Sequence, residues 1–536
     1  MTEREALYRT ICENPDDDTP RLVYADWLQE NGEEARAEFI RVQCNLAKLP
    51  RSDPGWAECL VREQQLLDAH RHRVYARGDE SWPEGVFPPG PRTVMERGFP
   101  AIADIFHIEG DRAFRERQFI NAIRSLTELT PVRHVLMRAH LGLSDLDMWL
   151  GHEAFAGMTG LSLLGCDSSS SADPEEVAAG VRHLSDLRRF RVSHRCNDRA
   201  LWELARPESP VSWEELELGL DEDVTSESIR KLLGRAGMTR LRGLTLSRDG
   251  PEDDFLSAVP SATLPELKVL RLFNLGSIDS PRSPPEASAR SGCPFPKLES
   301  LHLGGYSLNH TSLGSFIAGL PVGELSFRSA EVRPEALREL GAEAGRNLRV
   351  LELWDTSFDA SAHVMAEAPG FENLRSLTAW EAVMNPEVLK VLGSSGRLRG
   401  LRSLTLKASP VRRKMSRRSE GLESITLPNL STLSLNSFPL GRAGAIALAK
   451  NACLSGLRSL SLSDCAITGR GAAALLASPY LRELEYLDLQ DNGLRGGVEA
   501  LAHPDILPRL GKCNLTGNRL PESVRAKLAG RPGVMT

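Results

Sequence analysis

Long apolar runs, an excess of basic residues and a secretory leader are all missing from this chain of 536 residues. No stretch approaches the roughly eighteen consecutive apolar residues that a transmembrane helix needs, so we expect no membrane span. The formal net charge of −7 at pH 7 shows no basic excess, and we therefore expect no nucleic-acid partner. The first residues, MTEREALYRTICENPDDD, are charged and lack an apolar leader core, so we expect a cytoplasmic protein.

The motifs of common catalytic and metal sites are absent as well. The sequence has no phosphate loop (GxxxxGKS/T), no GxGxxG, no HExxH and no GxSxG. Its nine cysteines are scattered without a CxxC pair, and we interpret them as reduced and mostly buried. Asp16, Asp17 and Asp18 lack the spacing of a calcium loop, and Asp18 or Thr19 is better explained as a helix cap. We therefore expect no catalytic residue, no metal, no cofactor and no small-molecule substrate, and we predict that the chain is not an enzyme.

What the sequence has instead is a short apolar pattern that recurs fifteen times. The clearest copy is LEYLDLQDNGL, in which Leu484, Leu487, Leu489, Asn492 and Leu494 define the spacing. The steps between copies run from 24 to 31 residues, and self-similarity at this period predicts a solenoid. The other copies begin at Val132, Met158, Leu187, Trp213, Leu241, Leu267, Leu298, Val322, Leu348, Leu374, Leu401, Leu430, Leu457 and Leu510.

Each repeat divides into two halves. The LxxLxL segment alternates at period two, which predicts a short strand, and the Asn or Cys three places on is expected to satisfy backbone groups opened by a turn. The second half is usually rich in Ala and Leu, as at residues 441–454, which predicts a helix. Two repeats depart from this pattern: residues 279–296 form a Pro/Ser-rich loop, and residues 409–421 form a basic loop that we interpret as solvated.

The repeats resemble the leucine-rich-repeat family, and their length is similar to that of its ribonuclease-inhibitor-like subclass. The resemblance implies an α/β solenoid, a horseshoe with parallel strands on the concave face and helices or loops on the convex face. Ahead of the repeats, NPDDDTPRLVYADWLQENGEEARAEFIRVQ (residues 14–43) resembles the bacterial repeat-companion domain. That resemblance implies an architecture, a small all-α domain preceding repeats, and no particular reaction.

Four segments follow from these patterns. We predict a helical repeat-companion domain at 1–75, a linker with an N-terminal capping unit at 76–131, about fifteen leucine-rich repeats at 132–520, and a C-terminal tail at 521–536. In the first segment, Asp26 and Arg41 could form a docking pair, but we favour an internal ion pair that ties two helices together.

A pair of tryptophans marks the candidate binding site. Most residues predicted to face the inner side of the strands are small and polar, whereas Trp354 and Trp380 occupy the same position in adjacent repeats and should lie about 4.8 Å apart at the backbone. One interpretation is an interface hot spot, and the other is that the two indoles stack and simply cover the sheet. The predicted partner-binding residues are Arg271, Phe273, Arg328, Glu352, Trp354, Asp355, Trp380 and Glu381.

The leading hypothesis is a non-enzymatic scaffold or adaptor that binds a partner protein on the concave strand face. Two alternatives come from other classes. One is a GTPase-activating protein, because Ran GTPase-activating proteins resemble this repeat subclass. The other is a substrate receptor of a degradation complex, with an enzyme inhibitor as a special case of the leading hypothesis.

Overall fold

The computed structural model describes residues 2–49 and, apart from residue 439, residues 425–536, together with most repeat strands and helices between them. The chain divides into two compact units: unit 1 comprises Met1–Asp249 and Ser257–Leu267, and unit 2 comprises Gly250–Leu256 and Lys268–Thr536. The predicted basic loop and most of the predicted Pro/Ser-rich loop lie outside the described residues. The larger gaps in the description are 50–55, 68–85, 88–94, 106–116, 139–149, 165–173, 249–258, 274–292, 305–316, 382–386 and 409–424.

The chain begins with three helices, as the sequence predicts. They are α1 (Glu3–Glu13), α2 (Asp18–Glu30) and α3 (Glu34–Lys48). Thr2 and Glu5 form a capping box at the start of α1. The predicted cap of α2 was wrong by one residue: Asp17, not Asp18, accepts the hydrogen bond from the Thr19 amide (2.8 Å). Asp18 instead forms an ion pair with Lys48 on α3 (3.2 Å).

A buried aromatic cluster holds the three helices together. Tyr8 on α1 and Tyr24 on α2 both contact the ring of Phe99, with centroids 5.9 and 6.2 Å apart. Phe99 belongs to a short antiparallel hairpin, β2 (Met95–Glu96) and β3 (Phe99–Pro100), inside the segment predicted as a linker. On the surface of the module, Asp26 and Arg41 form the expected ion pair between α2 and α3 (2.6 Å).

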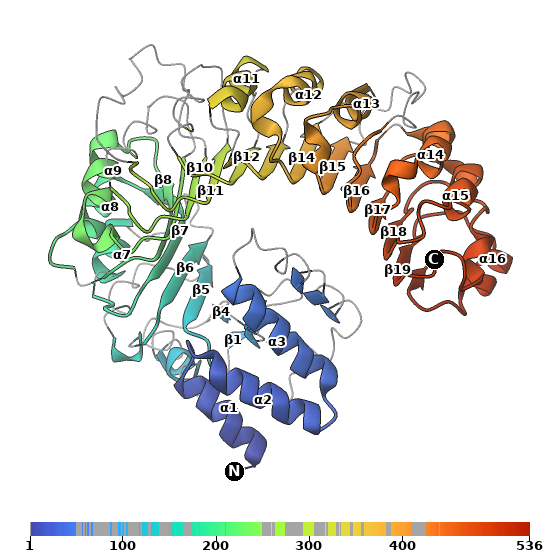
Figure 1. Ribbon diagram of the computed structural model, residues 1–536. Helices are drawn as coiled ribbons and strands as arrows, with labels where there is room; N and C mark the ends of the chain where they lie inside the picture. The colour runs from blue at the N-terminus through green and yellow to red at the C-terminus, as the bar shows by residue number, and fades with distance from the viewer. Residues whose placement is uncertain are drawn as a thin grey trace. The chain divides into compact units, whose positions relative to one another are not determined.

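The rest of unit 1 is a stack of parallel strands with helices on one side (Figure 1). Every neighbouring pair from β4 to β9 is parallel, and β1 (Val86–Phe87) joins β4 antiparallel. The strands are β4 (Ala103–Ile105), β5 (His134–Arg138), β6 (Gly160–Leu164), β7 (Arg189–Cys196), β8 (Glu215–Leu220) and β9 (Gly243–Arg248), and the helices are α7 (Pro174–Val181), α8 (Asp198–Leu204) and α9 (Ser226–Leu233). Arg133, just before β5, donates to the Cys12 carbonyl (2.8 Å) and so ties this stack to α1.

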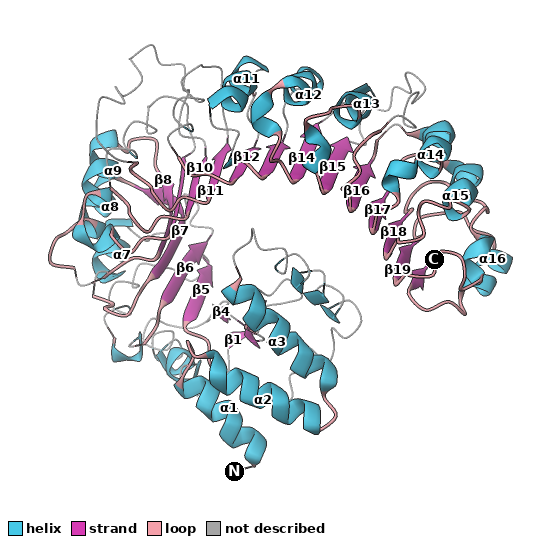
Figure 2. Cartoon of the chain, viewed as in Figure 1, coloured by secondary structure: helices cyan, strands magenta, loops and turns pink. Residues whose placement is uncertain are grey.

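Unit 2 repeats the same arrangement, with strands on the inside of its curve and helices on the outside (Figure 2). Its strands pair in parallel from β10 to β20. The strands are β10 (Val269–Phe273), β11 (Ser300–Gly304), β12 (Glu324–Arg328), β13 (Val350–Trp354), β14 (Ser376–Glu381), β15 (Ser403–Ala408), β16 (Thr432–Asn436), β17 (Ser459–Ser461), β18 (Tyr486–Asp488), β19 (Lys512–Asn514) and β20 (Val534–Met535). The helices are α11 (Pro334–Glu343), α12 (Phe358–Glu367), α13 (Glu387–Gly393), α14 (Gly441–Ala449), α15 (Thr468–Leu476) and α16 (Glu522–Leu528).

The leucine pattern sets the register of this stack. On β13, Leu351 and Leu353 are fully buried, and Leu351 pairs directly with Leu325 on β12 and Leu377 on β14. Since side chains alternate along a strand, the residues between the leucines face the inner side. On this strand the structure therefore confirms the predicted alternation of core and inner-face positions.

Asparagines close the turns of the C-terminal repeats, as the sequence predicts. The Asn492 Oδ1 atom accepts from the amides of Cys465 (3.0 Å) and Ile467 (3.2 Å) in the preceding repeat. Asn518 repeats this arrangement one rung later, accepting from the amides of Asn492 and Leu494 at 3.0 Å each. Each asparagine thus satisfies backbone donors of its neighbour, and adjacent repeats are joined at their turns.

The segment predicted as a C-terminal tail holds α16 and β20. Strand β20 continues the parallel stack, because Val534 pairs with Cys513 on β19. Arg531 fastens this end: its guanidinium donates to the carbonyls of Leu501 (2.7 Å) and Ile506 (2.8 Å), among others. Such charge-assisted bonds to backbone carbonyls hold this segment to the repeat before it.

Candidate interaction surface

The two tryptophans lie side by side on the inner strand face of unit 2. Trp354 ends β13 and pairs in register with Trp380 on β14, so the predicted adjacency is confirmed. Their ring centroids are 4.5 Å apart, and the ring planes are inclined by 51°. Both residues are partly buried. The second interpretation from the sequence, contact between the two indoles, is therefore a feature of the site.

A cation flanks each indole. Arg328 on β12 pairs in register with Trp354 and places its Cζ atom 5.2 Å from the centroid of that ring. Lys407 on β15 pairs with Trp380 and places its Nζ atom 4.0 Å from that ring's centroid. Cations over aromatic faces are attracted by the ring quadrupole. We call Arg328, Trp354, Trp380 and Lys407 the cation–indole row.

Among the described residues, no carboxylate neutralises the charges of the row. Within the part of the chain that the structure describes, neither Arg328 nor Lys407 has an ion pair or a hydrogen bond from its charged group. The nearest described acid, Glu352, serves a different purpose. One of its oxygens, Oε2, accepts from the Ser326 hydroxyl (3.1 Å) and lies 3.4 Å from the Trp354 Nε1 donor. Glu352 therefore orients the indole of Trp354.

Not every predicted site residue joins the row. Phe273 and Arg271 lie on β10, two strands before Arg328. The Phe273 ring covers Gly304 on β11: a Cβ atom added at Gly304 would lie 2.6 Å from Phe273 Cδ1. Phe273 is therefore a further large side chain on the inner face, two strands before the row begins. Asp355 and the side chain of Glu381 lie outside the described residues.

The prediction of the site left out Lys407. It occupies the same strand position as Trp380, one repeat later, so aligning the repeats does bring it beside the tryptophans. Because a lysine side chain is flexible, however, the sequence did not indicate that the Lys407 ammonium would lie over the Trp380 ring. The structure supplies that contact, and with it the symmetry of a cation at each end of the row.

A family model described as a leucine-rich repeat matches residues 456–476. These residues contain β17 and the whole of α15, which is one strand and its following helix. The repeating unit is a leucine-rich repeat. Parallel strands with helices outside them make the fold a leucine-rich-repeat solenoid, preceded by a small all-helical segment. No match was found among curated proteins.

Three solved structures are similar to this chain at low identity. A chain of the TLR13–ssRNA13 complex shares 17% identity, over 80% of this chain and 59% of that chain, with a TM-score of 0.39. A chain of the yeast Rad7–Elc1 complex shares 16%, over 78% and 87%, with a TM-score of 0.37. The ectodomain of the Arabidopsis thaliana receptor kinase GASSHO1/SCHENGEN3, in complex with CASPARIAN STRIP INTEGRITY FACTOR 2, shares 12%, over 75% and 60%, with a TM-score of 0.24. The chain spans less than two thirds of the first of these, and likeness at this level carries no information about its partner.

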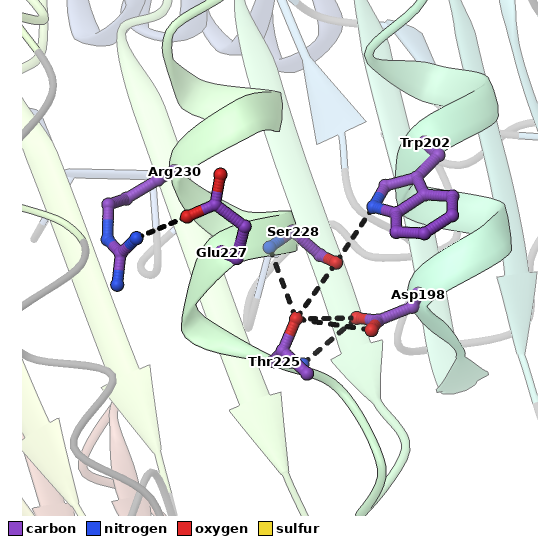
Figure 3. A network of polar contacts seen from close by, with 6 residues as sticks. All are labelled: Asp198, Trp202, Thr225, Glu227, Ser228 and Arg230. Carbon is purple, nitrogen blue, oxygen red and sulfur yellow. Dashed lines mark hydrogen bonds and ion pairs between the residues drawn. The ribbon is translucent and has the colours of Figure 1, made fainter.

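Another tryptophan is exposed on the outer side of the leucine-rich repeats. Trp202 on α8 is 46% exposed, its Nε1 donates to the Ser228 hydroxyl on α9 (2.9 Å), and Lys231 lies over its ring at 5.1 Å. Ser228 in turn contacts Thr225, which Asp198 holds through its carboxylate (Figure 3). Here the indole links two successive helices, and its polar edge is already satisfied. Trp202 is therefore a matched reference for the inner tryptophans.

The pKa shifts of two buried thiols and of His134 follow mainly from their burial. Burial raises the pKa of the Cys44 thiol to about 11 and that of Cys513 to about 12, so both stay protonated at neutral pH and are poor nucleophiles. Burial, followed by the charges of Arg189 and Arg191, lowers the pKa of His134 to about 4. Among the described residues, no cluster of His, Cys, Asp or Glu could hold a metal ion. In the same part of the chain, no helix combines the length and apolar character needed to cross a bilayer.

Proposed function

We propose that this protein is a non-enzymatic scaffold that binds a partner protein on the inner strand face of unit 2, with the cation–indole row at the centre of the interface. Tryptophan and arginine are the residue types most enriched among interface residues that dominate affinity. The row combines both, on strands whose other inner-face side chains are mostly small. A large amphipathic side chain among small ones extends further from the sheet, so it would contact a partner first.

One observation carries this proposal: two adjacent tryptophans are held on the inner face by ring contacts and not by burial. Leu353 and Ala379, which alternate with them along β13 and β14, are fully buried in the core. Trp354 and Trp380 lie on the opposite side of the same strands and remain partly exposed. Because the strands fix both backbones, little conformational entropy is lost on binding.

A binding experiment with the full chain tests the proposal. A photo-crosslinking amino acid placed at Ser434, on the neighbouring strand β16, captures the partner in cells and identifies it. The partner is then titrated against wild type and against the Trp354→Ala, Trp380→Ala double variant. We expect the double substitution to weaken binding by about 2–4 kcal/mol, which is about 30- to 1,000-fold.

The matched control is Trp202→Ala, which removes an exposed indole with a cation over its ring from the outer helices. This variant should bind the partner as wild type does. Thermal unfolding of each variant separates loss of binding from loss of structure. Equal affinity of wild type and the double variant, with both folded, would exclude the inner face around the row as the interface.

A further inference from the structure

We propose that the cation–indole row recognises an extended acidic segment of the partner, with two carboxylates about four residues apart. This inference rests on the proposed function and specifies the chemistry of its partner. The segment would cross strands β12 to β15. One carboxylate would meet Arg328, the other would meet Lys407, and an apolar side chain between them would lie on the two indoles.

The ring contacts determine which part of each indole a ligand can reach. Trp354 lies between Arg328 and Trp380 in the row, and Trp380 lies between Trp354 and Lys407. These neighbours leave little room for a planar ligand to stack on either indole. Nucleic-acid bases bind aromatic residues by such stacking, so the row disfavours a single-stranded nucleic acid as its ligand.

Both indoles are partly exposed, so each keeps some surface that a partner can reach. An aromatic ring has a negative face and a positive edge. The faces of these indoles already attract the cations, and the edges favour oxygen atoms and aliphatic groups from the solvent side. A peptide that presents carbonyl oxygens and one apolar side chain matches this surface better than a base or a second aromatic ring.

Charge complementarity sets the ends of the segment. The ammonium of Lys407 and the guanidinium of Arg328 contact rings, and within the described part of the chain neither meets a carboxylate. A carboxylate from a partner can approach each cation on the side that its indole leaves open. Glu352 lies beside the row and is occupied by Ser326 and Trp354, so it would repel an acid there and confine the segment to the row itself.

The strand spacing predicts the distance between the two carboxylates. Arg328 and Lys407 lie on strands three steps apart, which is about 14 Å at roughly 4.8 Å per step. An extended peptide advances about 3.4 Å per residue. Four residues of extended chain therefore span the row, which predicts the pattern Glu-x-x-x-Glu and not a closer pair.

Labelled peptides test this pattern on the full chain. The probe is acetyl-Gly-Glu-Thr-Leu-Thr-Glu-Gly-amide, and its binding is followed by fluorescence anisotropy. Two controls accompany it: the same peptide with Lys in place of both Glu, and the permuted peptide acetyl-Gly-Thr-Glu-Leu-Glu-Thr-Gly-amide, which has the same composition. We expect the probe to bind about tenfold more tightly than the Lys peptide, because two attractive charge pairs become repulsive, and about threefold more tightly than the permuted peptide.

The Arg328→Glu, Lys407→Glu double variant gives the decisive comparison. It keeps both indoles and should reverse the preference, binding the Lys peptide more tightly than the probe. Equal binding of the three peptides by wild type, or an unchanged preference in the double variant, would overturn the inference. So would a ten-residue oligothymidine that binds wild type more tightly than the probe.

The same variant, titrated with the crosslinked partner, separates the two proposals. If the partner is lost by Trp354→Ala, Trp380→Ala but bound unchanged by the charge-reversed chain, the proposed interface stands and the acidic segment is wrong. If neither variant changes partner binding, both proposals fail.

Discussion

From β12 to β15 the inner face of unit 2 carries two tryptophans flanked by cations, whereas from β16 to β19 most of its side chains are small and polar, with Tyr486 and Lys512 as larger exceptions. In the first region, the two indoles of Trp354 and Trp380 contact each other, and Arg328 and Lys407 each lie over one of them. Neither cation has a described carboxylate partner. In the second region, the Ser461 hydroxyl donates to Asn436 Oδ1 (2.7 Å). Hydrogen bonds between polar side chains of neighbouring repeats recur further along the second region. The strands of both regions are parallel and in the same register.

The comparison shows how one backbone serves two purposes. In the second region, hydrogen bonds within and between repeats satisfy the polar groups, and the bonds contribute to stability. In the cation–indole row, the contacts position side chains but leave charge and apolar area for a partner. If the proposed interface is right, stability and binding depend on different repeats, and substitutions should separate them.

The largest effect on stability is expected from Asn492→Ala. Asn492 is 4% exposed, and besides accepting from two amides it donates to the carbonyls of Leu462 (2.6 Å) and Gln490 (3.1 Å). Its loss leaves buried backbone groups without partners, at about 1–3 kcal/mol for each group that water cannot reach. We expect a total of about 4 kcal/mol, measured as faster hydrogen exchange of the Cys465 and Ile467 amides by about a thousandfold.

The control for this prediction is Asn436→Ala. Asn436 accepts from Ser461 and from the Ser463 amide (3.3 Å), but it lies on the inner face, where water can replace the lost bonds. We expect Asn436→Ala to lower the free energy of local opening by less than about 1 kcal/mol. Similar exchange rates in the two variants would show that the turn asparagines have no special role.

An intermediate effect is expected from Gly304→Ala, at the start of the large side chains. The added Cβ would lie 2.6 Å from Phe273 Cδ1 and 2.9 Å from the Arg328 carbonyl oxygen. The phenylalanine ring can move, but the carbonyl belongs to the backbone of β12, so we expect a loss of about 2 kcal/mol in urea unfolding. Gly456→Ala is the control, because its nearest atom is 4.0 Å away, and it should unfold as wild type does. Wild-type stability of Gly304→Ala would show that β11 and β12 adjust freely.

The smallest effect on stability is expected from Lys407→Met, which removes the charge and keeps most of the length. Only the cation–ring attraction is lost, so urea unfolding should report about 0.5–1 kcal/mol. Lys450→Met, at an exposed helix end, should change nothing measurable. If the free energy of unfolding fell by more than about 2 kcal/mol, Lys407 would be a residue that stabilises the fold, contrary to the proposed division between the two regions.

Periodicity explains why so much of the fold could be predicted. Each leucine pair specifies a strand, and the side-chain alternation places residues such as Trp354 and Trp380 at equivalent positions of neighbouring strands. Their adjacency therefore followed from counting residues. The position of Lys407 follows in the same way, although its contact with the Trp380 ring does not.

Contacts without a repeat could not be found in this way. Phe99 enters the core of the three helices from a segment rich in Pro and Gly, and its partner Tyr8 lies far away in sequence. Arg531 recognises backbone carbonyls, which every residue possesses, so no sequence pattern marks its targets. The choice of Asp17 over Asp18 as a cap depends on one residue of helix phase, which three consecutive aspartates leave open.

The shared hydrogen-bond pattern of Asn492 and Asn518 also bears on how such a chain can change its length. Each asparagine accepts from the same pair of amide positions in the repeat before it. A tandem duplication of one whole repeat would therefore present a copied asparagine with the two amides it requires. Unequal recombination within this part of the gene could therefore lengthen the protein in a single step without a folding defect.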